Sequence, residues 1–565
     1  MASTPPSPPE TLDLRWKKTD YSLFLDASKC EGLADEFSDR IEHCNHALSH
    51  NLDWWFEPLS TRSNFASPLF HHYCCFHICL KLVKAYEFPK VCLTDCDVIH
   101  EGLLSLQKQG VWEGKIVHTQ KRSPWAMFVK RFKAFGRTAL HMLVPYLLVR
   151  MFHRRPPRKA NAVLVDTFVV PGHESADRYY AGVLDLLRPE ERSLVCLVPT
   201  FHGYAIRDYP RAIRAVLESG NAILFKESFL RFADYAFALG HAARLFFVRP
   251  PRMPVGVFDL GNLIREEMRR FGGFENAVIG FLNFRFTKCL RQTGWKLKHV
   301  VDWYENQGAD RGWNYGFRFH FPDLPTVGYA TTSLSQWHLA TAPLPSERKR
   351  GVLPDCLKVP SRHLATAARK RDPELRVETT GGFRFSKPES ATTDKTGPLR
   401  ALVPLSYDLD LASHACRLAR NLISPAAKEK VYLIFKPHPA ADHRRVEALK
   451  TENITAGETW STRTFPEDLA RADAVLGCWT TSLLEAVVAG LPAGILPSPD
   501  GLFHNPIPEG AAEGWSFPVD SSETFAPLLA FARTCRNSPP SPPLDIFEPP
   551  TRKAALELLG LPHAP

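Results

Sequence analysis

Apolar runs of strand length alternate with amphipathic stretches of helix length over most of the chain. Strands that are apolar on both faces are typical of parallel sheets covered by helices on both sides. The pattern therefore predicts two α/β units in tandem, each built on a doubly wound parallel sheet. In the first unit the expected strands are residues 161–170, 193–200, 221–228 and 297–307, preceded by short strands at 21–28 and 91–98 that flank a core helix.

A second alternating series starts near residue 400, after a connection (340–400) that is rich in turn formers and charges. Such sheets bind ligands at the carboxyl ends of their strands, so we expect the site in a cleft between the two units. The main strands of the second series are expected at residues 400–406, 431–439, 474–479 and 491–498. The expected organisation is a loose tail (1–18), a first domain (19–340), a second domain (341–536) and a Pro-rich tail with a short helix (537–565).

One basic segment accounts for the whole net charge of +10. Between Glu113 and Asp166 there are 12 basic residues and no acidic one, whereas the rest of the chain has 58 basic against 60 acidic residues. Aromatic and aliphatic side chains, among them Trp125 and Phe128, are interleaved with these charges. Basic and aromatic side chains together favour the interface of an anionic membrane. We interpret residues 121–159 as an insertion in the first domain that attaches to such a surface.

Two other interpretations of residues 121–159 stay open. The segment also fits a buried helical hairpin with a solvated basic rim, bent at Pro145. A nucleic-acid patch is the third interpretation, although no recognition motif accompanies the charges.

The N-terminal residues and the cysteines favour the cytoplasm. The first twenty or so residues lack the apolar stretch of a secretory signal, and no run of about 18 apolar residues follows. The 13 cysteines are scattered without a compact framework, which is typical of free thiols in a reducing compartment. We expect a cytoplasmic protein that is peripheral on the inner face of the plasma membrane through its basic segment.

The first chemical motif is Lys436-Pro-His438-Pro, which comes directly after the apolar run at 431–435. A cation and an imidazole thus leave the second sheet at its ligand-binding edge, on a backbone that the prolines restrict. This combination suits an anion.

The second motif is the turn Thr480-Thr481-Ser482, which leads from an expected strand into an expected helix. Hydroxyl groups and free backbone N–H groups at the start of a helix favour phosphate. Glu485 follows one turn later, where its carboxylate can accept hydrogen bonds from ribose hydroxyls. Thr480 and Thr481 alone are equally explained as a helix N-cap.

Taken in order, these motifs resemble a known family. A strand ending in KPHP, then about 40 residues later a strand, a Ser/Thr turn, SLLEA and Gly-Leu-Pro, is similar to the C-terminal half of GT-B glycosyltransferases, especially bacterial ones that use CMP-sugars. The segment at 299–316 also resembles an uncharacterised group of surface carbohydrate biosynthesis proteins. The resemblance covers roughly residues 160–500.

The resemblance implies a GT-B fold, with two Rossmann-like domains facing a cleft. In that family the His-Pro and Ser/Thr motifs hold the nucleotide phosphate, which implies this role for His438 and for Thr480, Thr481 and Ser482. Its sialyltransferases and Kdo transferases imply a CMP-linked acidic sugar as donor.

For the catalytic base we choose Glu305, which the sequence places at the carboxyl end of a strand, before Gly308. The family's sialyltransferases usually have two acids followed by Gly in their acidic motif, whereas this chain has Asp302-Trp-Tyr-Glu305. A structural role for Glu305, pairing with Arg311 or capping the next helix, is the alternative.

Asp166 is the second candidate for the catalytic base and Glu227 the third. Arg384, in GGFRF, is a candidate partner for a phosphate or carboxylate, or an interdomain contact.

Metal and cofactor chemistry have little support in the sequence. The histidines and cysteines between His71 and Cys96 match no zinc-ligand spacing, and Cys in an apolar helix behaves as a small hydrophobe. We find no phosphate-binding P-loop, no dinucleotide motif after a strand and no Asp-x-Asp metal motif. We expect no cofactor beyond the donor, and no metal.

The sequence thus predicts a membrane-associated glycosyltransferase of surface polysaccharide synthesis, such as capsule or lipopolysaccharide. It would transfer Kdo or a sialic-acid-like sugar from a CMP-linked donor to a glycan or lipid-linked acceptor. A CDP-glycerol-type glycerophosphotransferase has a comparable motif layout. A sugar-nucleotide 2-epimerase and a non-catalytic component of a glycan assembly complex are the remaining alternatives.

Overall fold

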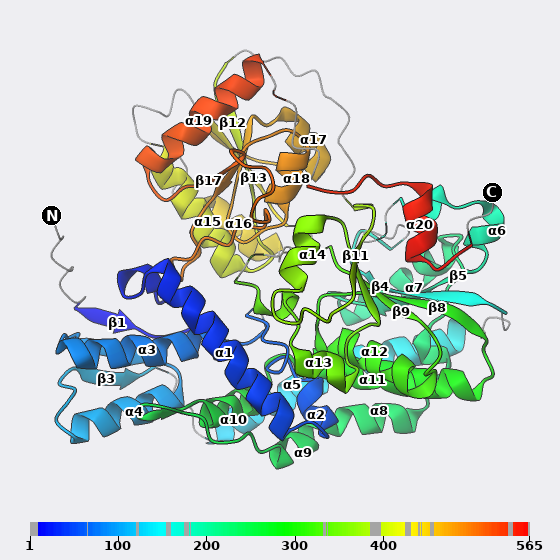
Figure 1. Ribbon diagram of the computed structural model, residues 1–565, viewed down its shortest axis with the longest axis horizontal. Coiled ribbons are helices and arrows are strands. Elements are labelled where there is room, and N and C mark those ends of the chain that lie inside the picture. Colours follow the sequence, from blue (N-terminus) through cyan, green and yellow to red (C-terminus); the bar gives the residue numbers. More distant parts are fainter. Residues whose placement is uncertain are drawn as a thin grey trace.

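The computed structural model consists of three regions, each built on a parallel sheet (Figure 1). The structure describes residues 10–64, 66–119, 124–153, 160–174, 180, 182–331, 335, 337–384, 397–423, 431–438, 441, 443–451, 457–538, 540 and 546–562.

The N-terminal region forms a small parallel sheet of its own. Its strands are β1 (Thr11–Asp13), β2 (Val91–Thr94) and β3 (Lys115–His118), in that order. Its helices are α1 (Ala27–Ala47), α3 (Leu69–Ala85) and α4 (Asp97–Lys108). The core helix expected before residue 91 is α3.

The strand expected at residues 21–28 is wrong. A 3-10 turn occupies Tyr21–Leu23, and α1 begins at Ala27. The carboxylate of Asp26 accepts a hydrogen bond from the backbone N–H of Lys29 (2.7 Å), which caps α1. A capping aspartate next to a short apolar run therefore favours helix initiation over a strand.

The sheet of the first domain has six strands, all parallel, in the order β11-β10-β9-β8-β4-β5. Its strands are β4 (Ala162–Val169), β5 (Val195–Phe201), β8 (Leu297–Trp303), β9 (Thr326–Tyr329), β10 (Cys356–Val359) and β11 (Val377–Thr379). Helices α11 (Phe274–Gln292) and α12 (Gly308–His320) share a core with one face, and α7 (Tyr209–Glu218) with the other. Buried Val and Leu side chains alternate between these two cores along β4 and β5, as a sheet covered on both faces requires.

The strand expected at residues 221–228 is reduced to a single bridge between Leu197 and Ile223. The chain then turns into a 3-10 helix at Lys226–Ser228. Buried Lys226 donates hydrogen bonds to Thr200 Oγ1 (2.8 Å) and Asn283 Oδ1 (2.7 Å). Because a buried ammonium needs such partners, the chain leaves the sheet there.

The first domain continues past residue 340, where we expected a boundary. Strands β10 and β11 still pair within the sheet of the first domain. Both are short and flanked by charged, turn-forming residues, so the sequence there has the composition of a linker. The short helix expected in the C-terminal tail is α20 (Arg552–Leu558), which also returns to the first domain and pairs Arg552 with Glu191. The chain therefore crosses between the domains twice, and the two crossings meet where Gly382 donates its backbone N–H to Glu548 (2.9 Å).

The second domain lies above the first in Figure 1 and has the strand order β14-β13-β12-β15-β16-β17. Its strands are β12 (Leu399–Pro404), β13 (Val431–Lys436), β14 (Glu458–Trp460), β15 (Ala474–Gly477), β16 (Ala493–Ile495) and β17 (Ser516–Pro518). Its helices include α15 (Leu409–Leu422), α16 (His443–Thr451), α17 (Phe465–Arg471), α18 (Ser482–Val488) and α19 (Ser522–Asn537). The predicted α/β class with two doubly wound parallel sheets is confirmed.

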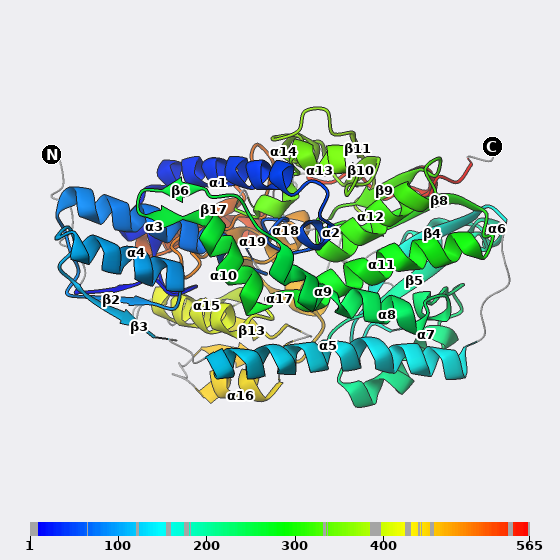
Figure 2. The same ribbon diagram turned by 90° about the horizontal axis from the view of Figure 1, so that it is seen from below.

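The basic segment forms one long helix, α5 (Pro124–Phe152), with Pro145 inside it. Figure 2 shows α5 along the outer border of the first domain, beside α7 and α8 (Phe232–Leu239). The alternative of a buried helical hairpin is wrong, because residues 124–152 are a single helix with an exposed face. Residues 121–123 and 154–159 of the expected insertion lie outside the described residues.

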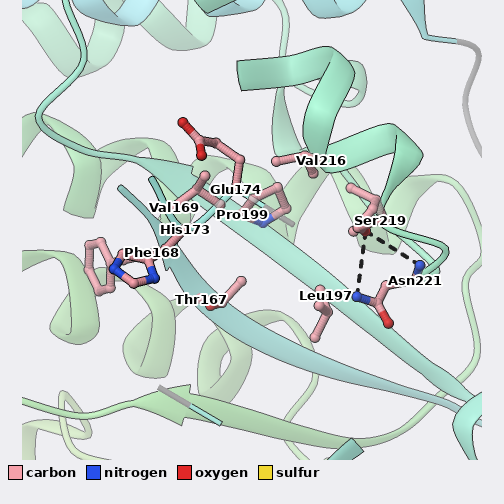
Figure 3. A pocket seen from close by; sticks show the side chains of 11 residues that line it. Thr167, Phe168, Val169, His173, Glu174, Leu197, Pro199, Val216, Ser219 and Asn221 are labelled. Carbon is pink, nitrogen blue, oxygen red and sulfur yellow. Dashed lines mark hydrogen bonds between the residues drawn. The ribbon is translucent and has the colours of Figure 1, made fainter. Parts of the chain in front are cut away.

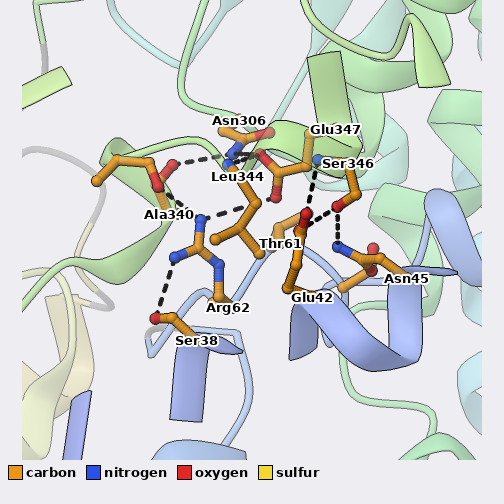
Figure 4. A network of polar contacts seen from close by, with 12 residues as sticks. Ser38, Glu42, Asn45, Thr61, Arg62, Asn306, Ala340, Leu344, Ser346 and Glu347 are labelled. Atoms are coloured by element: carbon orange, nitrogen blue, oxygen red, sulfur yellow. Dashed lines mark hydrogen bonds and ion pairs between the residues drawn. The ribbon is translucent and has the colours of Figure 1, made fainter. Parts of the chain in front are cut away.

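A buried network of charges joins the N-terminal helices to the first domain (Figure 4). Arg311 of α12 and Glu347 of α13 (Pro345–Arg350) are both fully buried and pair at 2.6 Å. Arg62 lies 3.7 Å from the same carboxylate, and burial lowers its pKa to about 10. Asn306 accepts from Arg311 Nε (3.0 Å) and donates to Glu347 (3.1 Å). Two guanidinium groups and one carboxylate thus share a buried site.

Replacing Glu347 with Ala is expected to lower the free energy of unfolding by about 3–5 kcal/mol, because it leaves buried guanidinium groups without their anion. Chemical denaturation measures the loss. The control is Glu447→Ala, which removes the partner of Lys450 on the surface of α16 and should cost less than about 1 kcal/mol. Similar small losses in both variants would contradict a structural role for the buried pair.

Candidate functional site

The order of the strands locates the ligand-binding edge of each sheet. In a doubly wound sheet, ligands bind outside the carboxyl ends of the two strands where the strand order reverses. In the second sheet these strands are β12 and β15, which are followed by residues 405–408 and 478–481. In the first sheet they are β4 and β8, and residues 304–307 follow β8.

Glu305 lies in the loop directly after β8, at the reversal point of the first sheet. Its carboxylate is half-buried and accepts hydrogen bonds from Trp303 Nε1 (3.1 Å) and Gln307 Nε2 (2.5 Å). The backbone N–H groups of Glu305 and Gln307 both donate to Asp310 Oδ2 (2.9 Å each). The two side-chain donors orient the carboxylate of Glu305, and Asp310 fixes the loop that carries it. Glu305 does not pair with Arg311, whose charge is taken by Glu347.

Three further carboxyl groups lie under this loop. Asp166, the second candidate base, is only 2% exposed and sits inside β4, which continues to Val169, so it is enclosed by the sheet. Asp302, also fully buried, accepts from Asn314 Nδ2 (2.7 Å). Burial raises the pKa of Asp302 well above its usual range, and the charges of Asp310 and Asp166 raise it further. Burial also raises the pKa of Asp310 well above its usual range. These buried acids lie beneath the Glu305 loop, and Asp310 holds the loop through two of its backbone N–H groups.

Tyr407 belongs to the candidate site in the second domain. It follows β12, is 57% exposed, and its ring centroid lies 5.9 Å from that of His438. The pKa of Tyr407 is raised by desolvation, by the charge of Asp408 and by the charge of Glu305. Glu305 and His438, which the sequence assigned to opposite sides of a cleft, thus both lie in the surroundings of Tyr407. Sequence reasoning missed Tyr407, although its place after an apolar strand is the signal that identified His438.

Lys436 and His438 are half-buried at the carboxyl end of β13. Lys436 donates to the carbonyl of Arg463, in the loop before α17, so its ammonium is held at the edge of the site. His438 keeps its ring against Tyr407. The described residues include both side chains but not Pro439.

The turn before α18 lies at the reversal point of the second sheet. Thr480, Thr481, Ser482 and Glu485 are all half-buried there. Thr480 Oγ1 accepts from the backbone N–H of Ser482 (3.3 Å), while Thr481 occupies the N-cap position without a side-chain cap bond. Trp479 has a left-handed backbone (φ 50°) and stacks on His504 at 3.7 Å between centroids. The stack holds the turn in a conformation that Trp rarely adopts.

Residues near the N-terminus also contact the ligand-binding edge of the second sheet. The sequence did not indicate these contacts. Lys17 pairs with Asp408, and the backbone N–H of Tyr21 donates to the carbonyl of Asp500 (2.7 Å). A cavity of about 30 Å³ lies between the two regions and is lined by Lys17, Trp479 and Asp500, among others. The N-terminal region thus borders the Thr480 turn directly.

The other expected site residues lie elsewhere. Arg384 is half-buried beside Tyr329, at the end of β9. Burial raises the pKa of Tyr329, and the charge of Arg384 acts in the opposite direction. Glu227 is buried beside Lys226, in a separate cavity of about 30 Å³ that His141 and Pro145 of α5 also line. Burial raises the pKa of Glu227. Glu227 therefore does not belong to the group around Glu305.

A further cavity, of about 20 Å³, lies at the outer edge of the first sheet, between β4, β5 and α7 (Figure 3). Asn221 donates to Ser219 Oγ at its rim. None of the predicted site residues lines this cavity.

Among the described residues, no group of three or more His, Cys, Asp or Glu side chains is placed to hold a metal ion. The histidine and cysteine cluster of α3 is part of the N-terminal core. There, burial lowers the pKa of His71 to about 4 and raises the thiol pKa values of Cys74, Cys75 and Cys79.

No family model and no curated protein matches the chain by sequence. Several solved structures match its fold. A putative UDP-N-acetylglucosamine 2-epimerase from Listeria monocytogenes is 13% identical, with a TM-score of 0.41 over 70% of this chain and 95% of that one. The co-structure of S. aureus MnaA with UDP is 11% identical, with a TM-score of 0.40 over 70% of this chain and 95% of that one. The calicheamicin glycosyltransferase CalG4 is 12% identical, with a TM-score of 0.36 over 71% of this chain and 94% of that one. At TM-scores of this size, nothing about donor, acceptor or site residues carries over to this chain.

Replacing Asp302 with Asn is expected to stabilise the protein increasingly as pH rises. A carboxyl group whose pKa is raised in the folded state contributes stability that is complete below ~3.9, the pKa of unfolded Asp, and is lost as pH rises through the folded value. Asn has no proton to lose. The free energy of unfolding of the variant, relative to wild type, should therefore increase between about pH 5 and pH 8 in urea titrations.

The exposed Asp185 offers a matched control, and Asp185→Asn should follow the wild-type pH dependence. A constant difference between Asp302→Asn and wild type across this range would contradict the raised pKa.

Proposed function

We propose that this protein is a glycosyltransferase that uses a nucleotide-sugar donor, bound between its two doubly wound domains. The observation that supports the proposal is that Glu305 follows β8 and Tyr407 follows β12, at the reversal points of the two sheets, with His438 beside Tyr407. A carboxylate on one side and an imidazole with a hydroxyl-rich turn on the other are the groups that sugar transfer from a phosphate requires.

In this proposal the second domain binds the donor. His438, Lys436 and the turn Thr480–Ser482 contact the nucleotide phosphate, and Glu485 accepts from the ribose hydroxyls. The imidazole and the hydroxyls act by hydrogen bonding to the oxygens on which negative charge develops as the donor breaks. Lys436 adds its charge at the same edge, held by the carbonyl of Arg463.

Glu305 acts as the base in this proposal. Its carboxylate takes the proton of an acceptor hydroxyl, the acceptor oxygen bonds to the anomeric carbon, and the bond from that carbon to the phosphate oxygen breaks. The nucleotide leaves with the electron pair of that bond. Trp303 and Gln307 orient the carboxylate, and Asp310 fixes its backbone, so the base is positioned before substrates bind.

The proposed donor is a CMP-linked acidic sugar such as Kdo or a sialic-acid-like sugar. The KPHP strand and the Ser/Thr turn, which resemble those of CMP-sugar enzymes, support this choice. Arg384, at the carboxyl edge of the first sheet, is the proposed partner for the sugar carboxylate. A CDP-glycerol donor is the alternative that the same motifs leave open.

The proposed acceptor is a glycan or lipid-linked glycan of surface polysaccharide synthesis, and the proposed location is the inner face of the plasma membrane. The exposed basic helix α5 supports this location. Within the described residues, no helix is long and apolar enough to cross a bilayer.

Calorimetry with CMP, CDP, UDP and GDP tests the donor. We expect selective binding of CMP, and an affinity at least about 10-fold lower in His438→Ala, because a hydrogen bond to a charged phosphate is lost. His46→Ala, on the exposed side of α1, is the control and should bind as wild type does. Preference for CDP or UDP would replace the CMP-linked donor by a glycerophosphoryl or nucleotide-diphosphate donor. Absence of any binding would favour a non-catalytic role.

Glu305→Gln separates catalysis from binding. It keeps the size of the side chain and its contact with Trp303, but Gln cannot take a proton. We expect sugar transfer to fall by about 10²–10⁴-fold while the Kd for CMP changes by less than about 2-fold. Wild-type rates in this variant would eliminate Glu305 as the base.

A further inference from the structure

The outward face of α5 is apolar along its whole length. Trp125 and Met151, near its two ends, are 71% and 73% exposed, although such side chains are normally buried. The spacing of these residues returns to the same side of a helix every three, four, seven or eight positions. The exposed apolar side chains of this face are Trp125, Phe128, Phe132, Leu140, Leu147 and Met151.

The inward face of α5 is the one that packs on the protein. Val149 and Thr138 are buried there, and Arg150 donates to the carbonyl of Leu230 (2.6 Å). The two faces are therefore distinct: one attaches α5 to the first domain, and the other carries exposed apolar side chains along a helix of about 43 Å.

A second exposed aromatic pair flanks the first half of α5. Phe246 and Phe247, in the 3-10 turn Leu245–Phe247, are 63% and 78% exposed. Arg131 of α5 lies over the ring of Phe246 (5.9 Å) and donates to the carbonyl of Arg269 (2.5 Å). The contact between Arg131 and Phe246 places this aromatic pair beside the first half of α5.

The charged side chains on α5 itself have one sign. Lys130, Lys133 and Arg137 are exposed on α5, and Arg249 is exposed next to the Phe246–Phe247 pair. No acidic residue occurs between Glu113 and Asp166. A protein partner of ordinary composition would not need so uniform a charge, whereas an anionic bilayer matches it.

We propose that α5, together with Phe246 and Phe247, docks on the surface of an anionic lipid bilayer with the helix axis parallel to the membrane. Trp125, Phe128 and Phe132 enter the boundary between headgroups and acyl chains, and the basic side chains contact the lipid phosphates. The inference does not depend on the proposed donor, because it uses no residue of the Glu305 and His438 site.

Vesicle co-sedimentation of the full chain tests the proposal. The probes are vesicles of phosphatidylcholine alone and of equal parts phosphatidylcholine and phosphatidylglycerol. We expect binding to the anionic vesicles, weakened by raised salt, and little binding to the neutral ones. The triple variant Trp125→Ser, Phe128→Ser, Phe132→Ser should need at least about 10-fold more lipid for half-binding. Neutralising Lys130, Lys133 and Arg137 to Gln should weaken binding on the order of 100-fold.

The matched control is Phe319→Ser, which removes an equally exposed aromatic side chain (63%) from α12, on the far side of α11 from α5 in Figure 2. It should bind vesicles as wild type does. Wild-type CMP affinity and circular dichroism in each variant show that a loss of lipid binding is not a loss of fold. Absence of binding to anionic vesicles, equal binding to neutral ones, or an equal loss in Phe319→Ser would overturn the proposal. A protein that binds vesicles but no nucleotide would keep this inference and lose the proposed function.

Discussion

The buried ion pair of Arg311 and Glu347 is the interaction on which the arrangement of the first domain depends. Charges removed from water cost several kcal/mol each unless all their polar atoms find partners. Here the carboxylate of Glu347, on α13, is shared by Arg311 of α12, by Arg62 in the turns before α3 and by Asn306 in the loop after β8. Because the same carboxylate satisfies groups from all these elements, none of them can shift alone. The loop that carries Glu305 is therefore held through Asn306, by contacts on its buried side.

The candidate site follows from topology as much as from chemistry. Two parallel sheets each reverse their strand order once, and each reversal leaves a loop at the carboxyl edge with no strand to continue it. The first sheet places Glu305 there, and the second places Tyr407 and the Thr480 turn. The buried acids Asp302 and Asp166 sit one layer deeper, inside β8 and β4. The half-buried Glu305 follows the fully buried Asp302 by only three residues along the chain.

The sequence was sufficient for the α/β class, for most strands of the second sheet and for the residues at its carboxyl edge, because buried parallel strands are continuous apolar runs. It failed where a contact distant in sequence decides the local structure. Residues 221–228 look like a strand, but Lys226 needs Thr200 and Asn283 as partners and leaves the sheet. Strand β10 looks like a linker because it is short and its neighbours are charged. No local pattern could place Lys17 beside Asp408, which lie almost 400 residues apart.

The two crossings of the chain between the domains run side by side at Gly382 and Glu548, joined by a backbone hydrogen bond. A second set of contacts joins the second domain to the N-terminal region, where Lys17 pairs with Asp408 and the backbone N–H of Tyr21 donates to the carbonyl of Asp500. The second domain is thus tied to the rest of the chain in two ways, covalently through the crossings and by polar contacts at Asp408 and Asp500. Only the polar contacts can be broken without cutting the chain, so they set how firmly the second domain is held against the N-terminal region.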